Sequence, residues 1–261
     1  MQFILAIICA LVPAAVLLWI IYRRDKRQPG PPKKLLRAFG YGILSVFLAW
    51  AFASVAGKLT GLDLEECKQS DIPHAFAGAF MLAAVPEELG KFFMLWLLLR
   101  KNPYFDKQFD GIVYAVFVGM GFAGVENVLF LLQSVGNGTL ISTSIWRGLL
   151  SVPLHFFCAV LMGYYYSLHH FGVDYDDYPN DPAKLTRRFP RLSLNLGIDP
   201  SLKSAIKILV APILAHGIYD GIIYSLSTNW VVGIISLILF GIFFYKVGKN
   251  SIEKIKRLTN K

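Results

Sequence analysis

The chain has 261 residues, of which 55% are hydrophobic and only 16% charged, and its mean hydropathy is +0.52. Several windows exceed 18 apolar residues, which excludes a soluble domain and predicts a polytopic membrane protein. The formal net charge of +9 would also suit nucleic-acid binding. The basic residues gather in alternate loops, however, so we interpret the charge as topological and expect no nucleic-acid partner. Cys9, Cys67 and Cys158 form no CxxC pair and predict neither a disulfide framework nor a thiolate metal site.

The hydrophobic windows predict an all-α fold of about seven transmembrane helices in one integral-membrane domain, residues 1–261. The first window has four basic residues behind it and none before it, the reverse of a signal peptide, so we expect a retained span. Residues 248–261 predict an interfacial cytoplasmic tail. The expected spans are 3–22, 35–57, 73–99, 111–132, 146–171, 204–226 and 230–247, of which those within about 73–226 carry the candidate site.

Basic residues predict the orientation of these spans in the bilayer. The outer loops of this layout contain only Lys58 and Lys68, whereas the alternate loops and the C-terminal tail contain nearly all the others. This bias predicts an outside N-terminus and a cytoplasmic C-terminus. Lys91 and Arg147 remain inside or at the edge of spans, and we expect Arg147 to extend toward the outer interface.

The third expected span contains the sequence Pro86-Glu87-Glu88-Leu-Gly-Lys91 between two apolar runs. Ionisable groups at this depth are costly to insert and indicate a functional site. Either carboxylate can meet the ammonium of Lys91 on one helix face, because they are four and three residues apart. Pro86 is expected to kink or interrupt the helix there. A buried ion pair that only locks helix packing is the alternative.

In the fourth expected span, Ala115, Gly119, Ala123 and Asn127 recur at every fourth residue. Small residues at this spacing form one face of a helix and let a neighbouring helix approach closely. We therefore expect close helix packing along this face.

Three further spans carry polar residues at similar depth. Helix rise places Glu126 and Asp220 roughly 9 Å inside the outer ends of their spans. His155 is roughly 13 Å inside, His216 about 15 Å and Glu87 about 20 Å. All five therefore fall between the middle of the bilayer and its outer leaflet, although neighbouring helices run in opposite directions. This agreement predicts one cavity that opens toward the extracytoplasmic side.

The residue types in this cavity suit hydrolysis by activated water. Paired carboxylates beside a cation can divide their roles, so that one acts as general base. Two histidines with a carboxylate also suit zinc, although the sequence contains no HExxH motif. No GxSxG serine or GxGD aspartate is present as a nucleophile. Two other classes stay open: a proton- or ion-coupled transporter with buried relays, and a non-catalytic membrane scaffold.

Taken together, the motifs Glu87-Glu88-x-x-Lys91, Phe122-x-x-x-Glu126-Asn127, His155 and His216-x-x-x-Asp220 resemble those of the PrsW family of intramembrane proteases. That family is similar to the CAAX-prenyl endopeptidase and bacteriocin-processing (CPBP) membrane proteins. The resemblance covers about residues 86–224. Lys91 lies one residue earlier than the arginine of the wider superfamily, and Glu126 stands where a histidine is usual.

The resemblance implies a bacterial cytoplasmic-membrane protease that cleaves membrane-anchored proteins, in some members an anti-sigma factor cut on its extracytoplasmic side. By this analogy Glu87 or Glu88 activates water, while Lys91 keeps one carboxylate ionised. His155 and His216 bind a metal, such as zinc, or stabilise the oxyanion; metal-independent glutamate catalysis is the other form. Further expected site residues are Glu126 as metal ligand or proton carrier, Asn127 as oxyanion donor and Asp220 as the partner of His216.

Overall fold

The computed structural model describes residues 2–24, 31–136, 138–171 and 200–228, together with isolated positions between 231 and 246. All regular elements in these ranges are helical, in agreement with the predicted all-α class. Five helical segments are long and apolar enough to cross a membrane: 2–23, 32–60, 108–133, 140–171 and 205–226. The expected seventh span and the tail lie largely or wholly outside the described residues, and the orientation of the chain stays a prediction.

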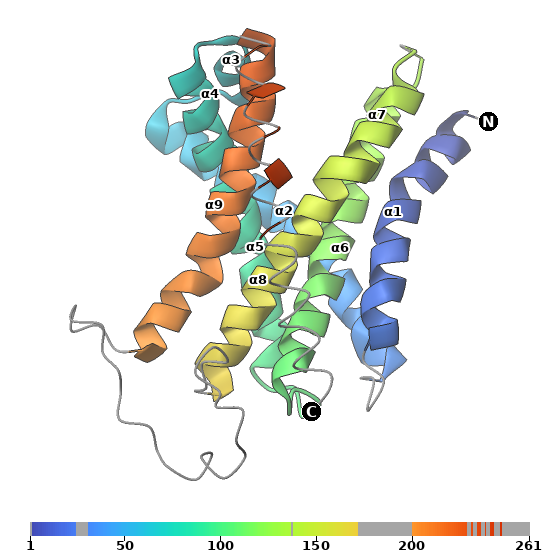
Figure 1. Ribbon diagram of the computed structural model, residues 1–261, viewed down its shortest axis with the longest axis vertical. Helices are drawn as coiled ribbons and strands as arrows, with labels where there is room; N and C mark the ends of the chain where they lie inside the picture. Colours follow the sequence, from blue (N-terminus) through green and yellow to red (C-terminus); the bar gives the residue numbers. More distant parts are fainter. Residues whose placement is uncertain are drawn as a thin grey trace.

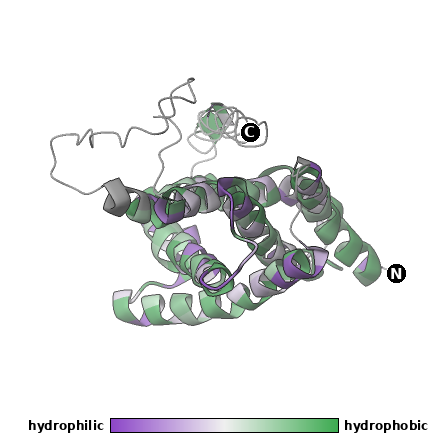
Figure 2. Cartoon of the chain, turned by 90° about the horizontal axis from the view of Figure 1, so that it is seen from below, coloured by the Kyte–Doolittle hydropathy of each residue, from purple (hydrophilic) through white to green (hydrophobic). Residues whose placement is uncertain are grey.

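The helices form an upright bundle (Figure 1). Its elements are α1 (Gln2–Arg24), α2 (Pro32–Thr60), α3 (Leu64–Gln69), α4 (Ile72–Gly78), the π-helix η1 (Ala79–Ala84), α5 (Val85–Leu99), α6 (Gln108–Gln133), α7 (Leu140–Trp146), the π-helix η2 (Arg147–Ser151), α8 (Val152–Phe171) and α9 (Pro200–Thr228). Helix α6 packs against α1, α2 and α8, and α9 packs against α8, α4 and η1. Viewed from below, the helices at the rim are mostly hydrophobic, as expected of surfaces that face lipid (Figure 2).

Small residues allow α6 to approach its neighbours closely. A Cβ atom on Gly119 would lie 2.7 Å from the Cβ of Ala159, and one on Gly163 would lie 2.8 Å from the Cβ of Ala115. These distances are below ordinary contact, so α6 and α8 need glycine at both positions. The close packing predicted for the small-residue face of α6 is confirmed at Ala115 and Gly119.

Two π-helical turns immediately precede the helices that carry Glu87 and His155. The π-helix η1 ends just before α5, whose second residue is Pro86, and η2 ends just before α8, whose second residue is Pro153. Proline lacks an N–H group and its ring clashes with the carbonyl of the preceding turn, so a widened turn accommodates it. The interruption predicted at Pro86 is therefore present as a π-helix.

Candidate active site

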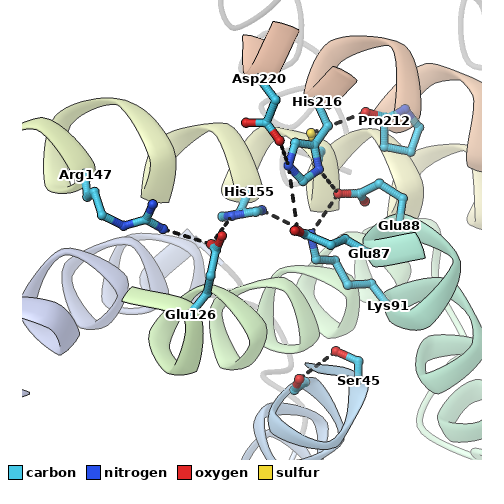
Figure 3. Close-up of polar contacts among 12 residues, drawn as sticks. Ser45, Glu87, Glu88, Lys91, Glu126, Arg147, His155, Pro212, His216 and Asp220 are labelled. Atoms are coloured by element: carbon cyan, nitrogen blue, oxygen red, sulfur yellow. Dashed lines mark hydrogen bonds and ion pairs between the residues drawn. The ribbon is translucent and has the colours of Figure 1, made fainter. Parts of the chain in front are cut away.

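The candidate site lies where α5, α6, α8 and α9 converge (Figure 3). The α5 residues Glu87, Glu88 and Lys91 follow η1 directly, because the π-helical turn and Pro86 start a new α-helix at Val85. Lys91 Nζ lies 2.8 Å from Oε1 of Glu88 and 3.5 Å from Oε2 of Glu87. The pairing predicted from their spacing is therefore present, and Lys91 contacts both carboxylates.

Histidine 216 joins α9 to the two glutamates. Its Nδ1 lies 2.9 Å from Oε1 of Glu88, and its Nε2 lies 3.7 Å from Oε2 of Glu87. Nε2 is also 3.3 Å from Oδ2 of Asp220, one helical turn further along α9. The imidazole is therefore held between three carboxylates.

Close packing of α9 on the preceding elements makes these contacts possible. Gly217 faces the ring of Phe80 on η1, and a Cβ atom on Gly221 would lie 2.5 Å from Phe76 on α4. Both glycines flank the face that carries His216 and Asp220. Larger residues there would move α9 away from the glutamates of α5.

Histidine 155 joins α8 to both α5 and α6. Its Nδ1 lies 3.0 Å from Nζ of Lys91, and its Nε2 lies 2.8 Å from Oε2 of Glu126. The aromatic ring of Phe122 lies 4.0 Å from Nζ of Lys91, in a cation–π contact that covers the ammonium. The structure thus brings seven of the eight predicted site residues into one polar network: Glu87, Glu88, Lys91, Glu126, His155, His216 and Asp220.

The eighth predicted residue, Asn127, lies apart from this set. Its side chain is fully buried, its Nδ2 donates to the carbonyl oxygen of Ala10 on α1, and its Oδ1 accepts from Nε of Arg147. Asn127 does not line the cavity. Its amide is therefore occupied by a contact between α1, α6 and η2, where it does not face the space available to a substrate.

Sequence reasoning assigned Arg147 to the outer interface, and that expectation is wrong. The guanidinium turns inward, with Nη2 2.9 Å from Oε2 of Glu126, and its side chain is only 16% exposed. The carboxylate of Glu126 is only 20% exposed and attracts the cation more strongly than the interface does, since an unpaired charge at this depth is costly. Lys91 and Arg147 were the two basic residues left inside or at the edge of spans, so the argument applied to Lys91 could have identified Arg147.

A cavity of about 900 Å³ opens above the polar network. Glu87, Glu126, His155, His216 and Asp220 line it, whereas Glu88 and Lys91 are absent from its walls. The rest of the lining includes Trp50 of α2, Lys68 of α3, Gln133 of α6, Trp146 of α7 and Tyr224 of α9. The cavity therefore extends from the polar network toward the end of the bundle where α3 and α7 lie (Figure 1).

The two adjacent glutamates have different surroundings. Glu88 is fully buried, its Oε1 contacts Lys91 and His216, and its Oε2 has no hydrogen-bond partner among the described residues. The side chain of Glu87 is 16% exposed and faces the cavity. Only Glu87 of the pair can therefore meet a molecule in the cavity.

The donor set fits a divalent cation. Glu87, His155 and His216 each offer one ligand atom, and these atoms lie within 4.8 Å of one another. One carboxylate and two imidazoles are a ligand set of zinc hydrolases. Four carboxylates share the network with the permanent cations Lys91 and Arg147, so fully ionised carboxylates and neutral imidazoles leave an excess of two negative charges. A divalent cation would balance that excess.

Comparison with known proteins identifies relatives over most of the chain. Residues 30–247 match the profile described as PrsW family intramembrane metalloprotease. Protease PrsW of Bacillus subtilis is 30% identical over 90% of this chain and 90% of its own length. Protease PrsW of Geobacillus kaustophilus is 33% identical over 62% of this chain and 65% of its own length, and that of Clostridioides difficile is 26% identical over 94% and 89%. No solved structure matches significantly.

Proposed function

The chain belongs to the PrsW family of intramembrane metalloproteases, and from this premise we propose that Glu87 acts on the water that hydrolyses a peptide bond of a membrane-anchored protein. Membership makes the chain a bacterial membrane protein and a hydrolase of peptide bonds. It favours the protease over the transporter and the scaffold that the sequence left open. Glu87 is assigned this role because it lies on the cavity wall, whereas Glu88 is fully buried and does not line the cavity.

We assign each residue around Glu87 a separate role in the hydrolysis. Glu88 and Asp220 orient the imidazole of His216 through its two nitrogens, and Lys91 holds Glu88 in place. In a metal-free form, Oε2 of Glu87 accepts the proton of water, and the N–H group at Nε2 of His216, which faces Glu87, donates to the oxyanion. Glu126, which contacts His155 at Nε2, supports that ring.

In a metal-loaded form, Glu87, His155 and His216 would hold the cation, with zinc as the proposed ion. Such a cation supplies Lewis acidity and lowers the pKa of water bound to it. The sequence suggested Glu126 as the third ligand, but Glu126 is paired with Arg147, so Glu87 replaces it in this proposal. With Nε2 of His216 toward the cation, Glu88 would contact the other ring nitrogen, Nδ1, as carboxylates beside metal-bound histidines do.

For the substrate, we propose a membrane-anchored protein such as an anti-sigma factor, cut on its extracytoplasmic side. The support is the cavity, which reaches Lys68 and Gln133 at the ends of α3 and α6 that the charge bias assigns to the outside. A peptide that enters there reaches Glu87 without crossing the cytoplasmic half of the bundle.

Cleavage of a single-span reporter protein in proteoliposomes tests this function. We expect Glu87→Gln to reduce the rate at least a hundredfold, because an amide cannot accept the proton of water or replace a carboxylate ligand. Glu65→Gln is the matched control, since Glu65 is exposed on α3, pairs with Lys68 and does not line the cavity. Unchanged cleavage by both Glu87→Gln and Glu88→Gln would show that the proposed chemistry is wrong.

A further inference from the structure

The contacts of Arg147 connect the candidate site to the first helix. Its Nη2 lies 2.9 Å from Oε2 of Glu126, and that same oxygen lies 2.8 Å from Nε2 of His155. On the other side, Nε donates to Oδ1 of Asn127 at 2.7 Å, and Nδ2 of Asn127 donates to the carbonyl oxygen of Ala10 at 3.0 Å. Arg147, Glu126 and His155 thus form a continuous chain of contacts (Figure 3).

The guanidinium is also fixed in orientation. Its central carbon lies 3.9 Å from the ring centroid of Phe130, so the cation is stacked on an aromatic face. Arg147 is the first residue of η2, and Gly148 beside it lies against α1, since a Cβ atom there would be 3.2 Å from Cγ of Pro13. The side chain is thus held by an aromatic face and by the amide of Asn127, and its Nη2 forms an ion pair with Glu126.

We propose that Arg147 is a positioning residue for hydrolysis, and this inference rests on the proposed function. Arg147 holds the carboxylate of Glu126 against Nε2 of His155, and Asn127 with α1 holds Arg147. The imidazole is thereby kept in the orientation in which Nδ1 faces Lys91 and the ring lines the cavity. In this proposal the buried Asn127 holds Arg147 in place through the hydrogen bond to its Nε.

The experiment measures kcat and KM for the single-span reporter in proteoliposomes, together with thermal unfolding in detergent. We expect Arg147→Gln to lower kcat at least tenfold with KM within about twofold, because the ring is misaligned while the substrate still binds. Arg147→Lys should recover part of the lost kcat by restoring the positive charge. Arg23→Gln is the matched control, since Arg23 also stacks on an aromatic ring, Trp19, away from the cavity.

A double variant separates positioning from general stabilisation. If Arg147 acts through Glu126, the Arg147→Gln/Glu126→Gln double variant should be no slower than Glu126→Gln alone. If the two substitutions lower kcat by the product of their separate effects, the inference is overturned. An unchanged kcat in Arg147→Gln would also overturn it. A rise in the KM of Arg147→Gln with unchanged kcat would overturn it too, because it would indicate instead that Arg147 contacts the substrate. If Arg147→Gln does not fold, Asn127→Ala tests the same inference, because it keeps the arginine and removes the amide that holds it. Unchanged kcat in both Asn127→Ala and Arg147→Lys would also overturn the inference.

Failure of this inference differs from failure of the proposed function. If the unmutated chain cleaves, Glu87→Gln does not, and Arg147→Gln cleaves normally, only the role of Arg147 is wrong. If the unmutated chain leaves the reporter intact, the proposed function and the role of Arg147 are both overturned.

Discussion

The imidazole rings of His155 and His216 meet edge to face, with centroids 5.0 Å apart and planes at 88°. The two rings come from α8 and α9, and each contacts a different carboxylate, Glu126 for His155 and Glu88 for His216. The contact between the rings adds to the link that Lys91 makes between Glu88 and His155, so we expect a substitution on either helix to affect the other.

Zinc binding tests the role of this ring pair. We expect the purified protein to bind about one zinc ion per chain, and His155→Ala or His216→Ala to lose it, because each removes one of three ligands. Elemental analysis after dialysis measures the stoichiometry. His74→Ala is the control, since His74 is exposed and pairs with Asp71 on the surface. Full cleavage activity in excess chelator would instead support the metal-free form.

Lys91 should matter far more to stability than Lys68, a partly exposed lysine in a similar pair. Its side chain is 3% exposed and lies beside Glu88, whereas Lys68 pairs with the exposed Glu65 at the same i,i+3 spacing. Removing one partner of a buried pair leaves an uncompensated charge and costs about 3–5 kcal/mol. An exposed pair contributes about 0–1 kcal/mol.

We therefore expect Lys91→Met to lower the free energy of unfolding by several kcal/mol and Lys68→Met to leave it nearly unchanged. Reversible unfolding in mixed micelles measures both variants. Equal stability of the two would contradict the interpretation of Lys91 as the counter-ion of Glu88.

Gly90 sets the distance between α5 and α2. A Cβ atom at this position would lie 2.9 Å from the carbonyl oxygen of Ser45 and 3.2 Å from the backbone nitrogen of Ala49. Because both are backbone atoms, space for a Cβ atom could be made only if α5 and α2 moved apart. Gly90→Ala should destabilise the protein by about 1–3 kcal/mol and reduce cleavage, because Glu88 and Lys91 lie on the same turn.

Gly40→Ala is the matched control for this prediction. Gly40 lies on α2, and a Cβ atom there would have no atom within 4 Å, so the variant should retain wild-type stability and cleavage. Thermal unfolding and reporter cleavage measured on both variants test the difference. A Gly90→Ala variant as stable as Gly40→Ala would show that α2 and α5 can separate at little cost.

The orientation of the chain can be tested by labelling. In a variant without Cys9, Cys67 and Cys158, a single cysteine at Glu65→Cys should react with an impermeant maleimide on intact cells. Lys101→Cys should react only after the membrane is opened, because the charge bias assigns its loop to the cytoplasm. Both positions are exposed. The opposite labelling pattern would reverse the predicted topology.

The sequence by itself determined the fold class and predicted most of the residues of the candidate site. Apolar windows identify membrane helices because the bilayer core has a fixed thickness and lacks water. Charged residues in those windows are rare because burying them is costly, so Glu87, Glu88, Lys91, Glu126 and Asp220 were visible without coordinates. Helix rise also predicted their depth, since 1.5 Å per residue converts position in a span into distance.

Only the tertiary structure decided which way these side chains face. Neighbouring residues on a helix point about 100° apart, so Glu87 and Glu88 share a depth but only Glu87 opens on the cavity. The π-helical turns η1 and η2 further change the rotation of the residues that follow. Arg147 turns toward Glu126, and Asn127 toward α1, because their partners come from other helices. The depth of a side chain follows from its position along its own helix, whereas the direction in which it points depends on how that helix packs against its neighbours.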